Sequence, residues 1–110
     1  MGLFSSGKTG NPPEDKTKFG RVFNYIIIDS IDDKPMESYP WEFGEKKKGL
    51  FAKRVEVVYL QPGHHEIAAH GATYQRDTAV IKVFVEAGDT YVLGAGEDET
   101  GNEGLYFELR

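Results

Sequence analysis

The stretch VEVVYLQPGHHEI, residues 55–67, decides the fold, and VEAGDTYVL, residues 85–93, repeats its form further along the chain. Each stretch has Val, Ile or Tyr on both sides of a turn marked by Pro-Gly or by Gly-Asp. Val, Ile and Tyr suit a pleated, half-buried surface, whereas Pro, Gly and Asp favour tight turns. The two stretches therefore predict strand–turn–strand units of a small antiparallel β-domain.

Composition limits the class of protein. The 110 residues are 39% hydrophobic, which suits one domain with one modest core. The net charge of −5 disfavours binding to nucleic acid or to an anionic membrane surface. Without cysteine, the chain has no disulfide, no thiolate nucleophile and no cysteine-ligated metal. No apolar run approaches the roughly 20 residues that span a bilayer, so we expect no membrane insertion.

Seven short strands are expected beyond a polar N-terminal region. Residues 1–18 are rich in Gly, Pro and charge, and they predict a disordered tail before a β-domain over residues 19–110. The predicted strands cover residues 21–29, 39–43, 51–61, 64–71, 78–86, 90–95 and 105–109. Pro40 places the second strand at a sheet edge. This number and spacing predict an all-β fold, a small antiparallel β-sandwich.

Alternation assigns the faces of the fifth predicted strand. Ile81, Val83 and Val85 share the face that we expect in the core, and Phe84 falls with the polar residues on the other face. No stretch repeats apolar residues at helical spacing for long, so we expect no helix of useful length.

Several turn and core residues together resemble a known group of proteins. An aspartate-containing turn at Ile31-Asp32 precedes Leu60-Gln61-Pro62-Gly63, and Tyr91 follows Gly88. This order resembles small bacterial cell-envelope proteins, many of them lipoproteins of unknown function, with transthyretin-like or carboxypeptidase-regulatory-like β-sandwiches. The resemblance implies a sandwich fold and a periplasmic or envelope location. A cytoplasmic location stays open because no apolar signal region opens the sequence.

Residues 2–9 match two short motifs. GLFSSGKT fits the phosphate-loop pattern, but no strand can precede it and Pro12-Pro13 follows it closely, so its structural context is missing. The same residues fit the myristoylation pattern through Gly2 and Ser6. We interpret the segment as part of the tail.

The three histidines raise the possibility of a metal site. His64, Glu66 and His70 share one strand face, whereas His65 lies on the other. Six residues of extended strand span about 20 Å, so His64 and His70 cannot share one ion. His64 and Glu66 are the candidate ligands if another strand supplies a third. In the simpler interpretation, His64 and Glu66 are solvated and His65 packs at the turn. We expect no cofactor.

Two acidic groups and the hydroxyls give little support for catalysis. Residues 29–33 and 97–103 carry clustered carboxylates, but turn chemistry explains both groups without calcium or paired-acid catalysis. No serine sits in a strand–turn–helix elbow. We therefore expect a protein that is not an enzyme.

Aromatic residues near the predicted edge strand are candidate anchors for a protein partner. Tyr39, Trp41 and Phe43 alternate along residues 39–43, and aromatic side chains dominate many interfaces. Packing within the sandwich is the competing interpretation. The sequence thus predicts a non-catalytic binding or structural module with a protein partner. The alternative is a small-ligand or metal-binding β-domain centred on His64 and Glu66.

Overall fold

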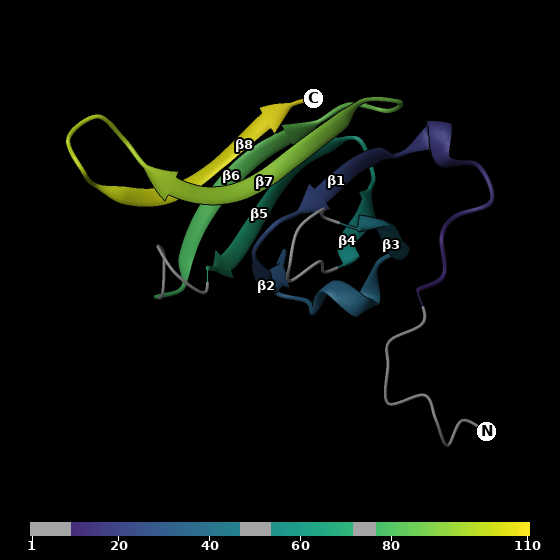
Figure 1. Ribbon diagram of the computed structural model, residues 1–110. Coiled ribbons are helices and arrows are strands. Elements are labelled where there is room, and N and C mark those ends of the chain that lie inside the picture. Colours follow the sequence, from purple (N-terminus) through teal and green to yellow (C-terminus); the bar gives the residue numbers. More distant parts are fainter. Residues whose placement is uncertain (1–9, 47–53, 72–76) are drawn as a thin grey trace, which may run out of the picture.

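The computed structural model describes residues 10–46, 54–71 and 77–110, and they form two packed β-sheets (Figure 1). One sheet has five strands in the order β3-β4-β1-β7-β8, and the other has three in the order β2-β5-β6. The strands are β1 (Gly20–Asn24), β2 (Ile27–Ile31), β3 (Trp41–Lys46), β4 (Arg54–Leu60), β5 (Gly63–His70), β6 (Ala79–Val85), β7 (Thr90–Glu97) and β8 (Glu103–Leu109). Helical structure in these ranges is limited to two 3-10 turns, η1 (Lys16–Lys18) and η2 (Met36–Ser38). The predicted all-β class is confirmed.

The first predicted strand is two strands in different sheets, so the described chain has eight strands and not seven. β1 ends at Asn24 in the five-stranded sheet, and β2 begins at Ile27 in the three-stranded sheet. The backbone N–H of Tyr25 donates to the Leu93 carbonyl at the corner between them. The run of Ile and Tyr suits a strand on either side of that corner, so local propensity does not reveal it.

Both predicted turn units connect the two sheets. β4 and β5 flank the Pro62-Gly63 turn, and β6 and β7 flank the Gly88 turn, yet neither pair shares a sheet. Gly63 and Gly88 adopt φ of 130° and 84°, a region in which a side chain is strained. The hairpins of the described chain are β3–β4, β5–β6 and β7–β8 instead.

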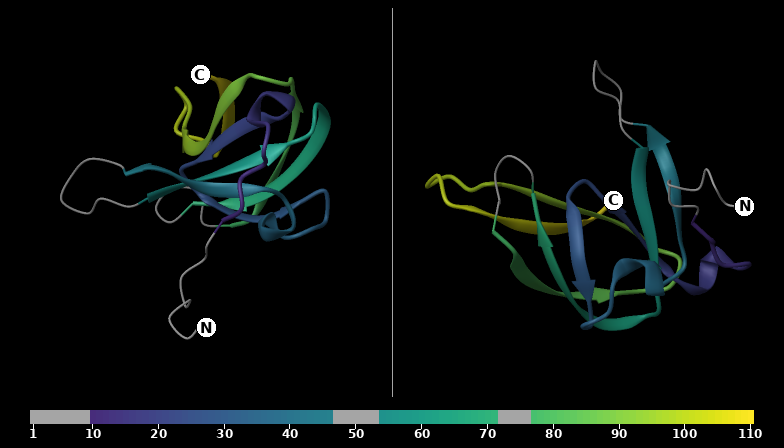
Figure 2. Two further views of the ribbon diagram at one scale, coloured as in Figure 1. Left: turned by 90° about the vertical axis from the view of Figure 1, so that its right-hand side faces the viewer. Right: turned by 90° about the horizontal axis from the view of Figure 1, so that it is seen from below.

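One strand pair is parallel, which corrects the expectation of a wholly antiparallel sandwich. β1 lies antiparallel to β4 and parallel to β7 in the centre of the five-stranded sheet. The β7–β8 hairpin extends past the rest of the described body (Figures 1 and 2).

The core lies between the sheets and follows the alternation. Val83 and Val85 are buried and Ile81 is half-buried against the core, while Phe84 points outward with half of its surface exposed. β4 is buried on both faces: Val58 and Leu60 join the core, and Val55, Val57 and Tyr59 occupy the outer face of the five-stranded sheet. A strand that is apolar on both faces needs cover on both sides.

The N-terminal region covers part of an edge strand. Residues 1–9, with both short motifs, lie outside the described residues, as do residues 51–53 of the third predicted strand. Residues 10–18 lead past β3 into η1, and the Trp41 N–H donates to the Asn11 carbonyl. β3 is an edge strand, as Pro40 predicted.

Candidate functional site

The aromatic group at residues 39–43 packs into the sandwich. Trp41 is 5% exposed and belongs to the core cluster, and its ring meets Phe43 edge to face at 5.1 Å. The Tyr39 hydroxyl donates to the Ile31 carbonyl at 2.8 Å. Trp41 is therefore a core side chain, and a partner cannot use it as an anchor without opening the sheet.

His64 and Glu66 lie on the outer face of the three-stranded sheet, as alternation predicted. Both are exposed, and they line a shallow hollow of about 480 Å³ with Lys82 and the Asp32–His65 pair. His64 packs against the Phe84 ring at 4.9 Å. Over residues 10–46, 54–71 and 77–110, no group of three or more His, Asp or Glu side chains is arranged to hold a metal ion. The third ligand that the metal hypothesis requires is therefore missing from this part of the chain.

Asp32 and His65 form a pair that locks the turn after β2 to the start of β5. Asp32 Oδ2 lies 2.7 Å from His65 Nδ1, and Asp32 Oδ1 accepts from the Glu66 N–H at 2.9 Å. His65 Nε2 lies 2.7 Å from the Gln61 carbonyl. Both ring nitrogens face acceptors, and only the doubly protonated ring donates to both. Because Nε2 is engaged by a backbone carbonyl, this pair does not present a free base to a substrate.

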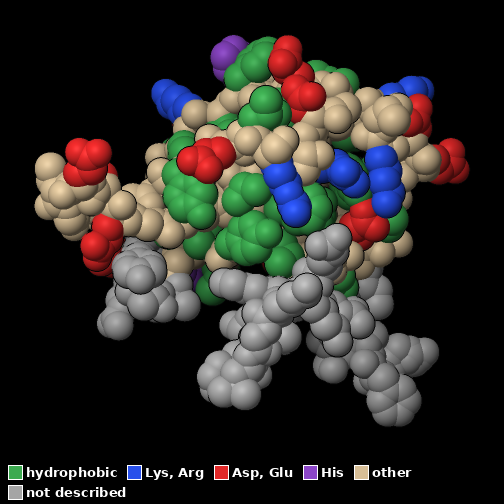
Figure 3. Space-filling model, turned by 45° about the horizontal axis from the view of Figure 1, so that its top comes forward, with side chains coloured by type: hydrophobic (Ala, Val, Ile, Leu, Met, Phe, Trp, Pro, Cys, Tyr) green, Lys and Arg blue, Asp and Glu red, His purple; other side chains and the backbone are tan. Residues whose placement is uncertain are grey.

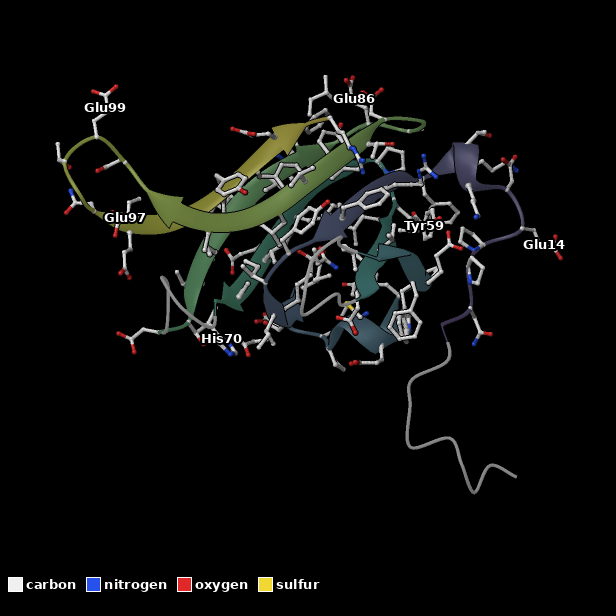
Figure 4. All side chains as sticks on the ribbon, in the orientation of Figure 1. Glu14, Tyr59, His70, Glu86, Glu97 and Glu99 are labelled. Carbon is white, nitrogen blue, oxygen red and sulfur yellow. The ribbon has the colours of Figure 1, made fainter. Side chains whose placement is uncertain are left out.

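A second carboxylate–histidine pair lies near the other end of β5, where Figure 4 labels His70. Asp29 Oδ2 lies 2.9 Å from His70 Nδ1 and accepts from the Thr78 hydroxyl at 2.9 Å. The hydroxyl proton thus points to the carboxylate and not to the imidazole, unlike the nucleophile–base contact of a hydrolase. This cluster ties β2, β5 and the start of β6 together.

These pairs predict a loss of stability in acid. The His70 hydrogen bond holds the pKa of Asp29 below its usual value. Burial alone would raise the pKa of Asp32, but the Glu66 N–H and His65 outweigh it, so that pKa is also lowered. A carboxylate with a lowered folded pKa stabilises the fold above its unfolded pKa, about 3.9 for Asp. That stabilisation is lost as the pH falls through the folded pKa.

We expect Asp32→Asn to cost about 1 kcal/mol of unfolding free energy at pH 6, because the charge-assisted bond to His65 is lost at a partly exposed site. The difference from wild type should shrink as the pH falls from 6 through the lowered folded pKa of Asp32, because the wild-type carboxylate is then protonated. Urea unfolding across this pH range measures it. Asp33→Asn is the control, because Asp33 shares the left-handed backbone of the turn. An equal cost in both variants would contradict a role for the Asp32–His65 pair.

A larger hollow lies on the outer face of the five-stranded sheet, and the sequence did not indicate it. We call it the arginine hollow; it has a volume of about 730 Å³. Its apolar floor comes from Phe23 on β1 and from Val57 and Tyr59 on β4; Phe23 stands opposite Val57, and Arg21 stands opposite Tyr59. Arg21 and Arg110 line it from β1 and from the end of β8. Figure 3 shows basic side chains beside hydrophobic ones on this face.

Glu42 in the lining of the arginine hollow belongs to a charged network. The Glu42 carboxylate accepts a hydrogen bond from the Tyr59 hydroxyl. It also forms an ion pair with Lys16, whose Nζ lies 2.8 Å from Glu42 Oε2. Burial favours the neutral acid, but Lys16, Tyr59 and Arg21 together lower the pKa of Glu42. Burial and the adjacent Glu42 raise the pKa of Tyr59. Glu42 is therefore ionised and already bonded to two partners.

The two arginines supply positive charge to the lining of the hollow. The Arg21 guanidinium donates to Thr90 Oγ1 at 3.4 Å, and the Arg110 guanidinium lies 4.6 Å from the centre of the Phe23 ring. Neither forms an ion pair with a carboxylate of the described residues. Guanidinium groups bind planar oxyanions in a bidentate manner. The hollow thus offers cationic donors above an apolar floor.

Two sequence signals point to this face once the register is known. Arg21 and Phe23 are two residues apart on β1, and so are Val57 and Tyr59 on β4. Both pairs must share a face by alternation. The position of Arg110 beside Phe23 depends on the parallel β1–β7 pairing, which no local pattern predicts.

The fold and this site define the class as a two-sheet β-sandwich with an open, arginine-lined hollow on one outer face. Comparison with protein-family models, curated proteins and solved structures found no significant match. The resemblance to cell-envelope proteins therefore stays a prediction. Across the described segments, no helix is long and apolar enough to cross a membrane.

Proposed function

We propose that this chain is a non-catalytic binding module whose arginine hollow takes a small apolar molecule with a carboxylate group. One observation carries the proposal: Arg21 and Arg110 line a hollow with an aromatic and aliphatic floor, and neither forms a direct ion pair with a carboxylate of the described residues. The rest of the chain is acidic, with a net charge of −5. Cations collected on one face of an acidic protein attract an anion to that face.

The ligand chemistry follows from the two kinds of lining. Phe23 and Phe43 line the hollow and are half-buried, so they offer apolar surface to a ligand body, whereas Val57 and Tyr59 are almost fully buried. The guanidinium groups satisfy a carboxylate through charge-assisted hydrogen bonds. Ionised Glu42 lines the same hollow, close enough to Arg21 for that guanidinium to lower its pKa, and it repels a second anionic group. A ligand with one carboxylate and one apolar end fits this polarity.

Titration of the isotope-labelled protein with 2-naphthoate, followed by NMR, tests the proposal. We expect the amide signals of Phe23, Val57 and Thr90 to shift with saturation. Arg21→Gln should weaken binding about ten-fold, since the loss of one charge-assisted hydrogen bond is worth about 1.5 kcal/mol.

Matched controls separate the charge from the shape of the probe. Lys34→Gln removes a cation from the turn after β2 and should leave binding unchanged. The neutral analogue 2-naphthamide should bind about ten-fold more weakly than 2-naphthoate. Equal binding of both probes, or shifts confined to the three-stranded sheet, would contradict the proposal.

The compartment rests on the resemblance alone. The resemblance to small envelope β-sandwich proteins supports a periplasmic location for this chain. Fractionation of the native cells with an antibody to this chain tests the location.

A further inference from the structure

The outer face of the three-stranded sheet has an exposed apolar surface. Val80 and Phe84 of β6 are 58% and 52% exposed, and Ile27 of β2 is 52% exposed. The register puts all three on the same side of the sheet as His64 and Glu66. The three apolar side chains share this face with charged residues, since Lys82 lies between Val80 and Phe84, and exposed apolar side chains on one sheet face are candidates for an interaction surface.

The pairing of β5 with β6 arranges this face in three rows. We call it the β5–β6 face, and each row sets one residue of β5 opposite one of β6. The rows are ring beside ring, acid beside base, and small beside large: His64 with Phe84, Glu66 with Lys82, and Ala68 with Val80.

This arrangement is complementary to a copy of itself, and we infer that the β5–β6 face packs against the same face of a second copy of the chain. Consider a two-fold axis in the interface, parallel to the strands and midway between β5 and β6. Rotation about it puts Lys82 of each copy over the partner's Glu66, and Val80 over the partner's Ala68. An axis across the strands would instead oppose like charges at the central row, which is destabilising. Charge and size therefore select one orientation.

The size of the face sets the strength of the association. From Ile27 and His70 at one end to Phe84 and His64 at the other, the face is about 20 Å long, and three strands make it about 15 Å wide. Such an area is well below the roughly 800 Å² per partner of a stable interface. The dimer is therefore weak and forms at high local concentration. Ile27, on the outer strand, lies at the rim.

Charge reversal tests the inference with unusual specificity. Lys82→Glu leaves two acids in the central row, and Glu66→Lys leaves two bases. Sedimentation equilibrium of wild-type protein up to roughly 1 mM should show a dimer with a dissociation constant on the order of 10⁻⁴ M. Each variant alone should associate at least about ten-fold more weakly. An equal mixture of the two should recover dimers near the wild-type strength, since each supplies the charge the other lacks.

Two controls and two adverse outcomes complete the test. Glu99→Lys at the tip of the β7–β8 hairpin (Figure 4) and Lys18→Glu on η1 make the same changes of net charge away from the face, and should not alter association. Circular dichroism checks that each variant is folded. A wild-type chain that is monomeric at 1 mM overturns the inference. A dimer whose dissociation constant is unchanged by both charge reversals overturns the inference as well, because the contact between copies then lies elsewhere.

Discussion

Replacement of Trp41 by alanine is expected to lower the free energy of unfolding by about 3–5 kcal/mol. Trp41 is 5% exposed and packs in the core at the edge strand β3, with Phe43 against its ring. The substitution removes the only tryptophan and leaves a cavity that the two sheets cannot close. Urea unfolding followed by far-UV circular dichroism measures the change without relying on tryptophan fluorescence.

The control for Trp41 is an aromatic residue outside the core. Tyr25 is 44% exposed at the corner between β1 and β2, and Tyr25→Ala should change stability by no more than about 0.5 kcal/mol. A cost below about 1 kcal/mol for Trp41→Ala would contradict its place in the core. It would also revive the interpretation of Trp41 as a surface anchor for a partner.

Gly20→Ala is expected to destabilise the protein by about 1–3 kcal/mol through overpacking. A Cβ at Gly20 would lie 1.9 Å from Cγ1 of Val85 and 3.1 Å from the Glu86 carbonyl oxygen. Val85 is fully buried on β6, so its side chain has no free space to enter. The glycine lets the start of β1 approach the opposite sheet closely. The midpoint of urea unfolding should fall at an unchanged slope.

A second substitution separates this clash from a general effect of alanine. Val85→Ala removes the clashing methyl group, so the cost of Gly20→Ala should be smaller in that background than in wild type. Gly104→Ala is the matched control, because its Cβ would have no neighbour within 4 Å. It should be neutral or slightly stabilising. Additive costs for Gly20→Ala and Val85→Ala would count against the close approach.

Most strand positions were predictable because strand and turn signals are local. The alternation of β6 placed Val83 and Val85 inside and Phe84 outside. The exposed side of β5 with His64 and Glu66 was predicted in the same way. The corner after Asn24 was missed, since the isoleucines that follow suit either sheet equally well.

The candidate sites were harder to predict because they combine residues from several strands. The arginine hollow needs β4, β1 and β7 side by side, with Arg110 brought to the Phe23 ring from the end of the described chain. For Trp41, the local sequence allowed two environments and did not distinguish them. An aromatic residue near an edge strand is equally compatible with a partner surface and with the core, and only packing distinguishes the two.

By itself, the sequence determined the all-β class, the positions of the turns and the side chains that share a face of each strand. These properties depend on residues within a few positions of one another. Tertiary structure alone decided which sheet each strand joins, the parallel pairing of β1 with β7, and the meeting of Arg21, Phe23 and Arg110. These depend on burying apolar faces that are far apart in the chain, and that free energy belongs to the whole fold and not to any local segment.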